Sequence, residues 1–263
     1  MLSTPPVAAP SSRDRRLIWI CIAILTALAW IYLIRLDRQM SASMAHDRMM
    51  AEMGMVMDMP RTTADVVLAF AMWVVMMVAM MAGAATPMLL LFAGAQNARG
   101  ANRVPMGVLL FGLGYLTVWV GFSAFAAIAQ EALHRAAMLS SAMAASSQRA
   151  SGVILIVAGA YQLTPFKGSC LTHCRSPLGF LMTKWREGRL GAFRMGFWHG
   201  GYCLGCCWAL MCVLFAVGIM NLLWVAALSV LVLMEKVGPF GAVVGRIAGG
   251  AIIVLGIIQE VTA

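Results

Sequence analysis

A histidine and three cysteines lie at helical spacing within one apolar stretch of the sequence: His199, Cys203, Cys206 and Cys207. On an α-helix these positions share a face with Met195, because residues three and four apart are neighbours on the helix surface. Thiolate and imidazole are ligands of Zn²⁺, whereas thiolate and thioether select Cu(I). Cysteine commonly serves as a small apolar residue, but three cysteines beside a histidine favour a metal or redox role.

A second group of the same residue types precedes the first by about thirty positions. Cys170, His173 and Cys174 would converge if their segment is helical. Neighbouring Lys167 and Arg175 favour the thiolate over the thiol. Either group alone is incomplete, but together they exceed the four ligands of a tetrahedral site. The predicted metal ligands are Cys170, His173, Cys174, His199, Cys203, Cys206 and Cys207.

Methionine is the other unusual residue, with 23 copies in 263 residues. Eight of them lie between residues 40 and 59, where Met53, Met55, Met57 and Met59 alternate with other residues. Thioethers are soft, neutral ligands suited to Cu(I). The alternative is a flexible apolar hairpin lying on the lipid surface.

A further methionine line follows in an apolar run, at Met72, Met76 and Met80. Spacing of four residues places these side chains on one helix face. Such a stripe more often faces lipid or packs against another helix. If it faces the cysteines instead, it predicts a path for the metal.

The composition determines the fold class. Hydrophobic residues make up 62% of the chain and charged residues 11%, and the mean hydropathy is +0.87, whereas soluble domains carry roughly 25% charged residues. The long apolar runs predict an all-α, polytopic transmembrane helix bundle, not a barrel. The basic residues behind the net charge of +9 flank these runs, so the expected partners are the lipid bilayer and a metal donor or acceptor protein, and no nucleic acid.

About seven spans are predicted, within a range of six to eight: 17–34, 66–94, 105–130, 151–166, 196–219, 222–237 and 241–259. The positive-inside rule places the N-terminus in the cytoplasm, with the protein in the bacterial inner membrane. The predicted organisation is a disordered cytoplasmic tail at 1–16, a first transmembrane anchor at 17–36, an external Met-rich loop at 37–64, and a six-span membrane domain at 65–263 that carries the Cys/His cluster.

Residues 65–260 resemble a bacterial family of predicted metal-binding integral membrane proteins of unknown function. The resemblance rests on short motifs, which read Tyr161-Gln162-Leu163-Thr164-Pro165, Cys170-x3-Cys174-Arg175, His199-Gly200-x-Tyr202-Cys203-Leu204-Gly205-Cys206-Cys207-Trp208, Glu235-Lys236 and Trp73-x2-Met76-Met77. It implies a polytopic bacterial membrane protein that binds metal.

The leading functional hypothesis is metal transport or delivery, with Cu(I) favoured over Zn(II) because of the thioethers. External methionines and internal cysteines would run from weak to strong ligands, which predicts inward movement of the metal. One alternative is a membrane thiol/disulfide oxidoreductase that uses Cys203 with Cys206 and Cys170 with Cys174. Another is a structural subunit of a membrane complex, in which the cysteines only pack. The sequence contains no P-loop, dinucleotide-binding or nucleophile-elbow motif that would predict an enzyme.

The charge pattern predicts a topology that reporter fusions can test. Fusions at the N-terminus and within 178–190 should report the cytoplasm, and fusions within 42–58 should report the external side. The segment 167–194 carries six basic residues against one acidic residue, and such an excess stays on the cytoplasmic side. An external report from 178–190 would contradict the orientation.

Overall fold

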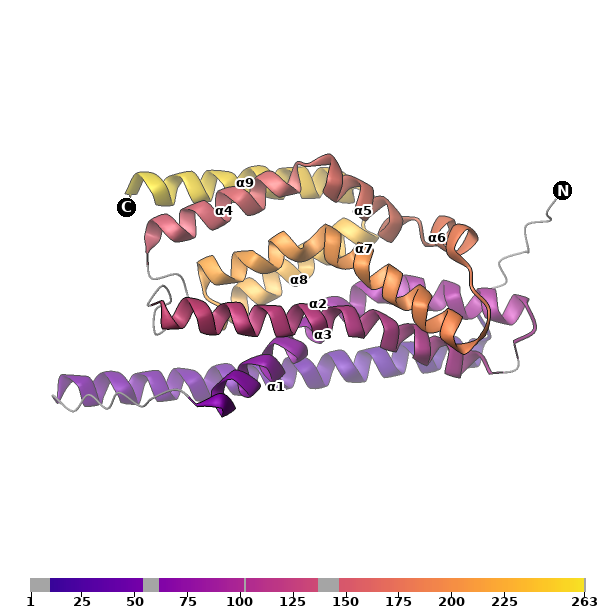
Figure 1. Ribbon diagram of the computed structural model, residues 1–263, viewed down its shortest axis with the longest axis horizontal. Coiled ribbons are helices and arrows are strands. Elements are labelled where there is room, and N and C mark those ends of the chain that lie inside the picture. The colour runs from indigo at the N-terminus through magenta and orange to yellow at the C-terminus, as the bar shows by residue number, and fades with distance from the viewer. Residues whose placement is uncertain (1–9, 54–61, 102, 137–146, 263) are drawn as a thin grey trace.

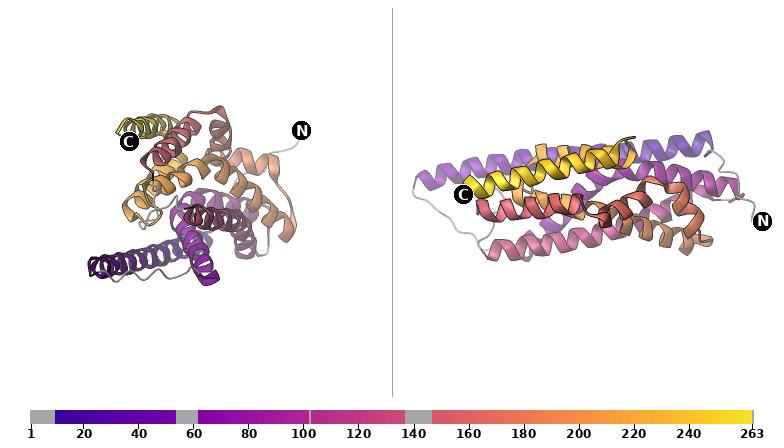
Figure 2. Two further views of the ribbon diagram at one scale, coloured as in Figure 1. Left: turned by 60° about the vertical axis from the view of Figure 1, so that its left-hand side comes forward. Right: turned by 90° about the horizontal axis from the view of Figure 1, so that it is seen from above.

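The computed structural model describes residues 10–53, 62–101, 103–136 and 147–262, and every regular element in them is an α-helix. This confirms the all-α prediction for the described residues. The helices are α1 (Ser12–Glu52), α2 (Thr63–Ala98), α3 (Val104–Arg135), α4 (Gln148–Gln162), α5 (Pro165–Arg175), α6 (Pro177–Lys184), α7 (Gly188–Val217), α8 (Leu222–Val237) and α9 (Gly241–Thr262). Figures 1 and 2 show α1 and α9 at opposite edges of the bundle, with α2, α3, α7 and α8 between them.

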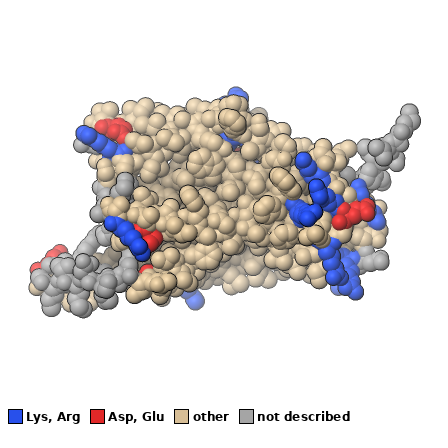
Figure 3. All heavy atoms as spheres, in the orientation of Figure 1, with Lys and Arg blue, Asp and Glu red and all other residues tan. Residues whose placement is uncertain are grey.

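Five of the described helices are long and apolar enough to cross a membrane, judged by length and composition: α1, α2, α3, α7 and α9. They coincide with five of the predicted spans. The other two predicted spans correspond to α4 and α8, which have 15 and 16 residues, fewer than the roughly 20 of a typical crossing. Seven spans therefore stay a prediction. On the face in Figure 3 most charged side chains gather at the two ends, with a broad uncharged band between them.

The first helix is longer than the sequence predicted. A loop was expected from residue 37, but α1 continues without interruption to Glu52. The reason is local, because residues 37–52 contain no glycine or proline and are rich in good helix formers such as methionine, alanine and arginine. Met53 lies exposed just after the helix, whereas Met55, Met57 and Met59, like residues 1–9 of the predicted tail, lie outside the described residues.

Glycines bring α3 and α7 into backbone contact. A Cβ added at Gly200 would lie 3.0 Å from the carbonyl oxygen of Tyr115, and one at Gly196 would collide with the backbone of Phe111. Small residues allow this close approach in apolar helix bundles, and Gly196 and Gly200 provide it here. The contact sets Tyr115 of α3 beside the cysteine-bearing part of α7.

Paired glycines also join α4 to α9. A Cβ at Gly159 would lie 2.7 Å from the Gly249 carbonyl oxygen, and one at Gly256 would lie 2.8 Å from that of Gly152. The two points of close contact are seven residues apart on each helix. They align α4 along α9 at the edge of the bundle (Figure 1).

The predicted fourth span divides into two helices. α4 ends at Gln162, and α5 starts at Pro165 after the turn at Thr164, whose side chain accepts a hydrogen bond from the Lys167 amide at 3.4 Å. Proline suits the first turn of a helix because its missing N–H has no partner there. The turn redirects the chain, so that α5 packs against α7 and brings Cys170 and Cys174 to it.

The α3–α7 contact yields a stability prediction. We expect Gly196→Ala to destabilise the protein by about 1–3 kcal/mol, because the added methyl group has no space against the α3 backbone. The control is Gly201→Ala on the same helix, where a Cβ would meet nothing within 4 Å. Thermal unfolding in detergent should show a midpoint lowered by roughly 2–10 °C for Gly196→Ala only. Equal midpoints for the two variants would contradict the close contact.

Candidate metal centre

Four cysteine thiols from two helices meet in the interior of the bundle. Cys203, Cys206 and Cys207 project from α7 and are at most 2% exposed, and Cys174 comes from α5. The Cys206 Sγ lies 3.4 Å from the Cys207 Sγ and 3.9 Å from the Cys174 Sγ. The Cys203 thiol interacts with those of Cys174 and Cys207. All four are free thiols, so the site gathers soft ligands from segments about thirty residues apart.

A buried lysine and a tyrosine converge on Cys203. The Lys236 Nζ lies 2.7 Å from the Cys203 Sγ, and the Tyr115 hydroxyl lies 3.0 Å from the same sulfur. Lys236 is 8% exposed and Tyr115 is 4% exposed, so neither side chain has open access to water. A buried ammonium group requires an anionic or strongly polar partner, and here that partner is the thiol.

Cys170 lies near the four thiols but does not join them. Its Sγ packs against Gly205 of α7, where an added Cβ would be 2.8 Å away. Partial burial raises the pKa of the Cys170 thiol, contrary to the expected thiolate. The two cations that were expected to favour the thiolate have other partners, because Lys167 pairs with Glu235 at 2.7 Å and Arg175 donates to the Glu235 carbonyl oxygen at 3.1 Å.

The two predicted histidine ligands lie in different surroundings. The His173 ring is exposed and stacks on Tyr202, with 4.3 Å between ring centroids, and its Nδ1 lies 2.9 Å from the Ser169 carbonyl oxygen. His199 is 3% exposed and sits among the rings of Phe111, Tyr115 and Phe180. Its buried Nδ1 has no hydrogen-bond partner.

The seven predicted ligands do not form one ready coordination sphere. Within the described ranges, no group of three or more His, Cys, Asp or Glu side chains has the geometry to hold a metal ion. The Cys206 thiol donates to the Cys203 carbonyl oxygen at 3.1 Å.

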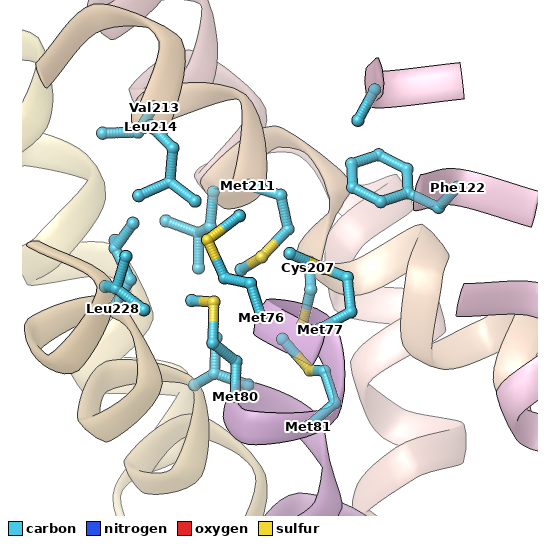
Figure 4. Close-up of a cluster of buried hydrophobic side chains, with 14 of the residues drawn as sticks. Met76, Met77, Met80, Met81, Phe122, Cys207, Met211, Val213, Leu214 and Leu228 are labelled. Atoms are coloured by element: carbon cyan, nitrogen blue, oxygen red, sulfur yellow. The ribbon is translucent and has the colours of Figure 1, made fainter. Parts of the chain in front are cut away.

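The methionine line of α2 faces the interior and not the lipid. Met72, Met76 and Met80 are at most 4% exposed, and so are their neighbours Met77 and Met81. Figure 4 shows the side chains at 76, 77, 80 and 81 directed toward α7, where Cys207 and Met211 lie. The Met81 Sδ is 4.0 Å from the Lys236 Nζ. The stripe therefore borders the thiol cluster.

Sequence reasoning missed the roles of Lys236 and Tyr115. The adjacent charges Glu235 and Lys236 entered the sequence analysis only as a motif of the family resemblance, with no role of their own, although ionisable residues at the end of an apolar run are functional candidates by default. That signal could have singled out Lys236. Nothing in the sequence near Tyr115 points to a contact with Cys203, because the two residues are 88 positions apart.

Comparison with known proteins places the chain in a family. No curated protein and no solved structure matches the chain. The sequence model of a family described as PpoB2, copper chaperone, matches residues 70–259, which include α3 to α8 and all the residues of the thiol cluster. Because this match covers well over half of the chain, the protein belongs to the PpoB2 copper chaperone family.

Proposed function

We propose that the protein is a membrane-embedded chaperone that holds Cu(I) through the thiols of Cys174, Cys203, Cys206 and Cys207 and delivers it to a partner. The observation that carries this proposal is the convergence of these thiols from α5 and α7 in the interior. Thiolates are soft ligands that bind Cu(I), and they also bind Zn²⁺. Bringing ligands from two helices to one point allows the metal to be released when the helices move apart.

The arrangement suits Cu(I) better than Zn²⁺. A structural zinc site uses four ligands in a closed tetrahedron, whereas no group of three or more His, Cys, Asp or Glu side chains in the described ranges is arranged to hold a metal ion. A pair of thiolates around Cu(I) carries a single net negative charge. The ammonium group of Lys236, 2.7 Å from the Cys203 Sγ, offsets that charge inside an apolar bundle.

The membrane location and orientation complete the proposal. Five long apolar helices and the uncharged band of Figure 3 support insertion in a bilayer. The basic segment between α5 and the first turns of α7 favours a cytoplasmic position for that end. The thiol cluster then lies nearer the cytoplasmic side than the far end of α7, which supports delivery toward the cytoplasm.

A thiol/disulfide exchange function is the second candidate. The Cys174 and Cys206 sulfur atoms come from different helices and lie 3.9 Å apart, so a disulfide could form between them after a small shift. The sequence suggested other pairs, Cys203 with Cys206 and Cys170 with Cys174. Neither of those pairs has a sulfur–sulfur contact among the interactions of the described residues.

The proposed thiol site predicts tight Cu(I) binding that depends on individual cysteines. The purified, reduced protein should bind Cu(I) in competition with a chromophoric Cu(I) chelator. Cys203→Ser and Cys206→Ser should each lose this tight binding, because a serine hydroxyl is a poor ligand for a soft metal.

Two controls accompany these variants. Cys21→Ser and Cys212→Ser should keep full binding, since Cys21 is exposed on α1 and the helical repeat turns Cys212 to another side of α7 than Cys206 and Cys207. Equal loss in all four variants would indicate unfolding, not ligation. A metal-free protein that forms a reversible Cys174–Cys206 disulfide would support the exchange function instead.

A second prediction concerns the buried lysine. We expect Lys236→Leu to weaken Cu(I) binding by roughly tenfold to a hundredfold, because a charge-assisted interaction contributes about 1.5–3 kcal/mol. The same chelator competition measures the change, and Lys184→Leu on α6, which removes an exposed lysine, should leave the affinity unaltered. If Lys236→Leu binds copper as tightly as the intact protein, the ammonium group plays no part in the site.

A further inference from the structure

A hollow of about 350 Å³ lies where α1 passes the turn between α7 and α8. Three methionines line it: Met40 and Met44 from α1, and Met220 from the turn. Met40 and Met44 are one helical turn apart and therefore face the hollow together. Asp37 and Asn221 provide its polar edge. Sequence reasoning grouped Met40 and Met44 with a loop and gave Met220 no role.

The chemistry of this lining differs from ordinary core packing. Methionine usually fills irregular gaps in a core, and protein interiors leave few voids larger than a water molecule. Here all three methionines are only partly buried and surround space that they do not fill. A hollow with three thioethers and a carboxylate at its edge offers soft ligands and negative charge, a combination that attracts a soft monovalent cation.

The position of the hollow connects it with the thiol cluster. It adjoins Val217 at the end of α7, ten residues beyond Cys207, which corresponds to about 15 Å along the helix. Met211 lies between them on the same helix. Figure 4 shows the side chains of Met76 and Met80 approaching Met211 from α2.

α2 runs antiparallel to α7, and its methionines lie between the hollow and the thiol cluster. Met81 lies near Lys236 and the Cys203 end of the cluster. Met72, nine residues earlier on α2, is therefore displaced toward the end of the bundle that holds the hollow (Figure 1). Buried thioethers thus occupy the interval between the hollow and the thiols.

We infer that the hollow is a second Cu(I) site, in which the thioethers of Met40, Met44 and Met220 receive the metal before it passes to the thiols. The identity of the metal rests on the proposed function. Neutral thioethers bind Cu(I) more weakly than thiolates do, because they add no negative charge. The metal therefore moves from a weak receiving site to a tight holding site by ligand exchange, without a change in oxidation state.

The test is an anaerobic Cu(I) titration of the full chain in detergent, with competing chelators of two different strengths. The intact protein should bind one tight and one weaker equivalent. A triple variant, Met40→Leu with Met44→Leu and Met220→Leu, should lose the weaker equivalent and keep the tight one. Retention of the tight equivalent also shows that the variant is folded.

The matched control replaces two exposed methionines of the same segment, Met49→Leu and Met53→Leu, which do not line the hollow. This double variant should keep both equivalents. A variant with Cys203→Ser and Cys206→Ser should lose the tight equivalent and keep the weaker one.

The outcomes separate the two proposals. If the triple variant retains the weaker equivalent, or loses the tight one as well, a separate thioether site is wrong. Absence of a weaker equivalent from the intact protein would overturn it too. If the intact protein binds only a weak equivalent that the triple variant loses, the thioether site stands and the thiol-based function fails.

Discussion

Two adjacent buried charges at the end of α8 hold the thiol-bearing helices in place. Glu235 is fully buried and pairs with Lys167 at the start of α5, and the Gln162 side chain completes this network. Lys236, the next residue, reaches Cys203 of α7. Breaking a buried ion pair leaves an uncompensated charge and costs about 3–5 kcal/mol. The position of α5 relative to α7, and with it the meeting of Cys174 with Cys206, therefore depends on the end of α8.

Local sequence patterns were sufficient to predict most of the helices and the helix face that carries Cys203, Cys206 and Cys207. The spacing of Cys203, Cys206 and Cys207 placed them together because α7 is a regular helix, and the structure keeps that face turned inward. The length of α1 could also have been predicted, since the segment after residue 36 lacks a helix breaker until Gly54. The prediction of a loop there relied on the polar, methionine-rich composition of the segment and gave its helix propensity too little weight.

The partners of each ligand could not be predicted, because they come from distant segments. His199 shares the helix face of the cysteines, yet rings from α3 and α6 enclose it. His173 is adjacent to Cys174 in sequence, but one residue of rotation on α5 turns it outward onto Tyr202. Helical spacing defines which residues share a face, and only tertiary packing decides what that face meets.

The uninterrupted length of α1 limits how copper can be received. A helix of 41 residues is about 60 Å long, whereas the hydrocarbon core of a bilayer is about 30 Å thick. In a membrane, the part of α1 beyond its apolar run therefore projects as a stiff rod. A flexible segment of the same length would sample a far larger volume. Met49 lies near the tip of this rod. Under the proposed function, a copper donor on that side would meet the hollow at the base of this rod.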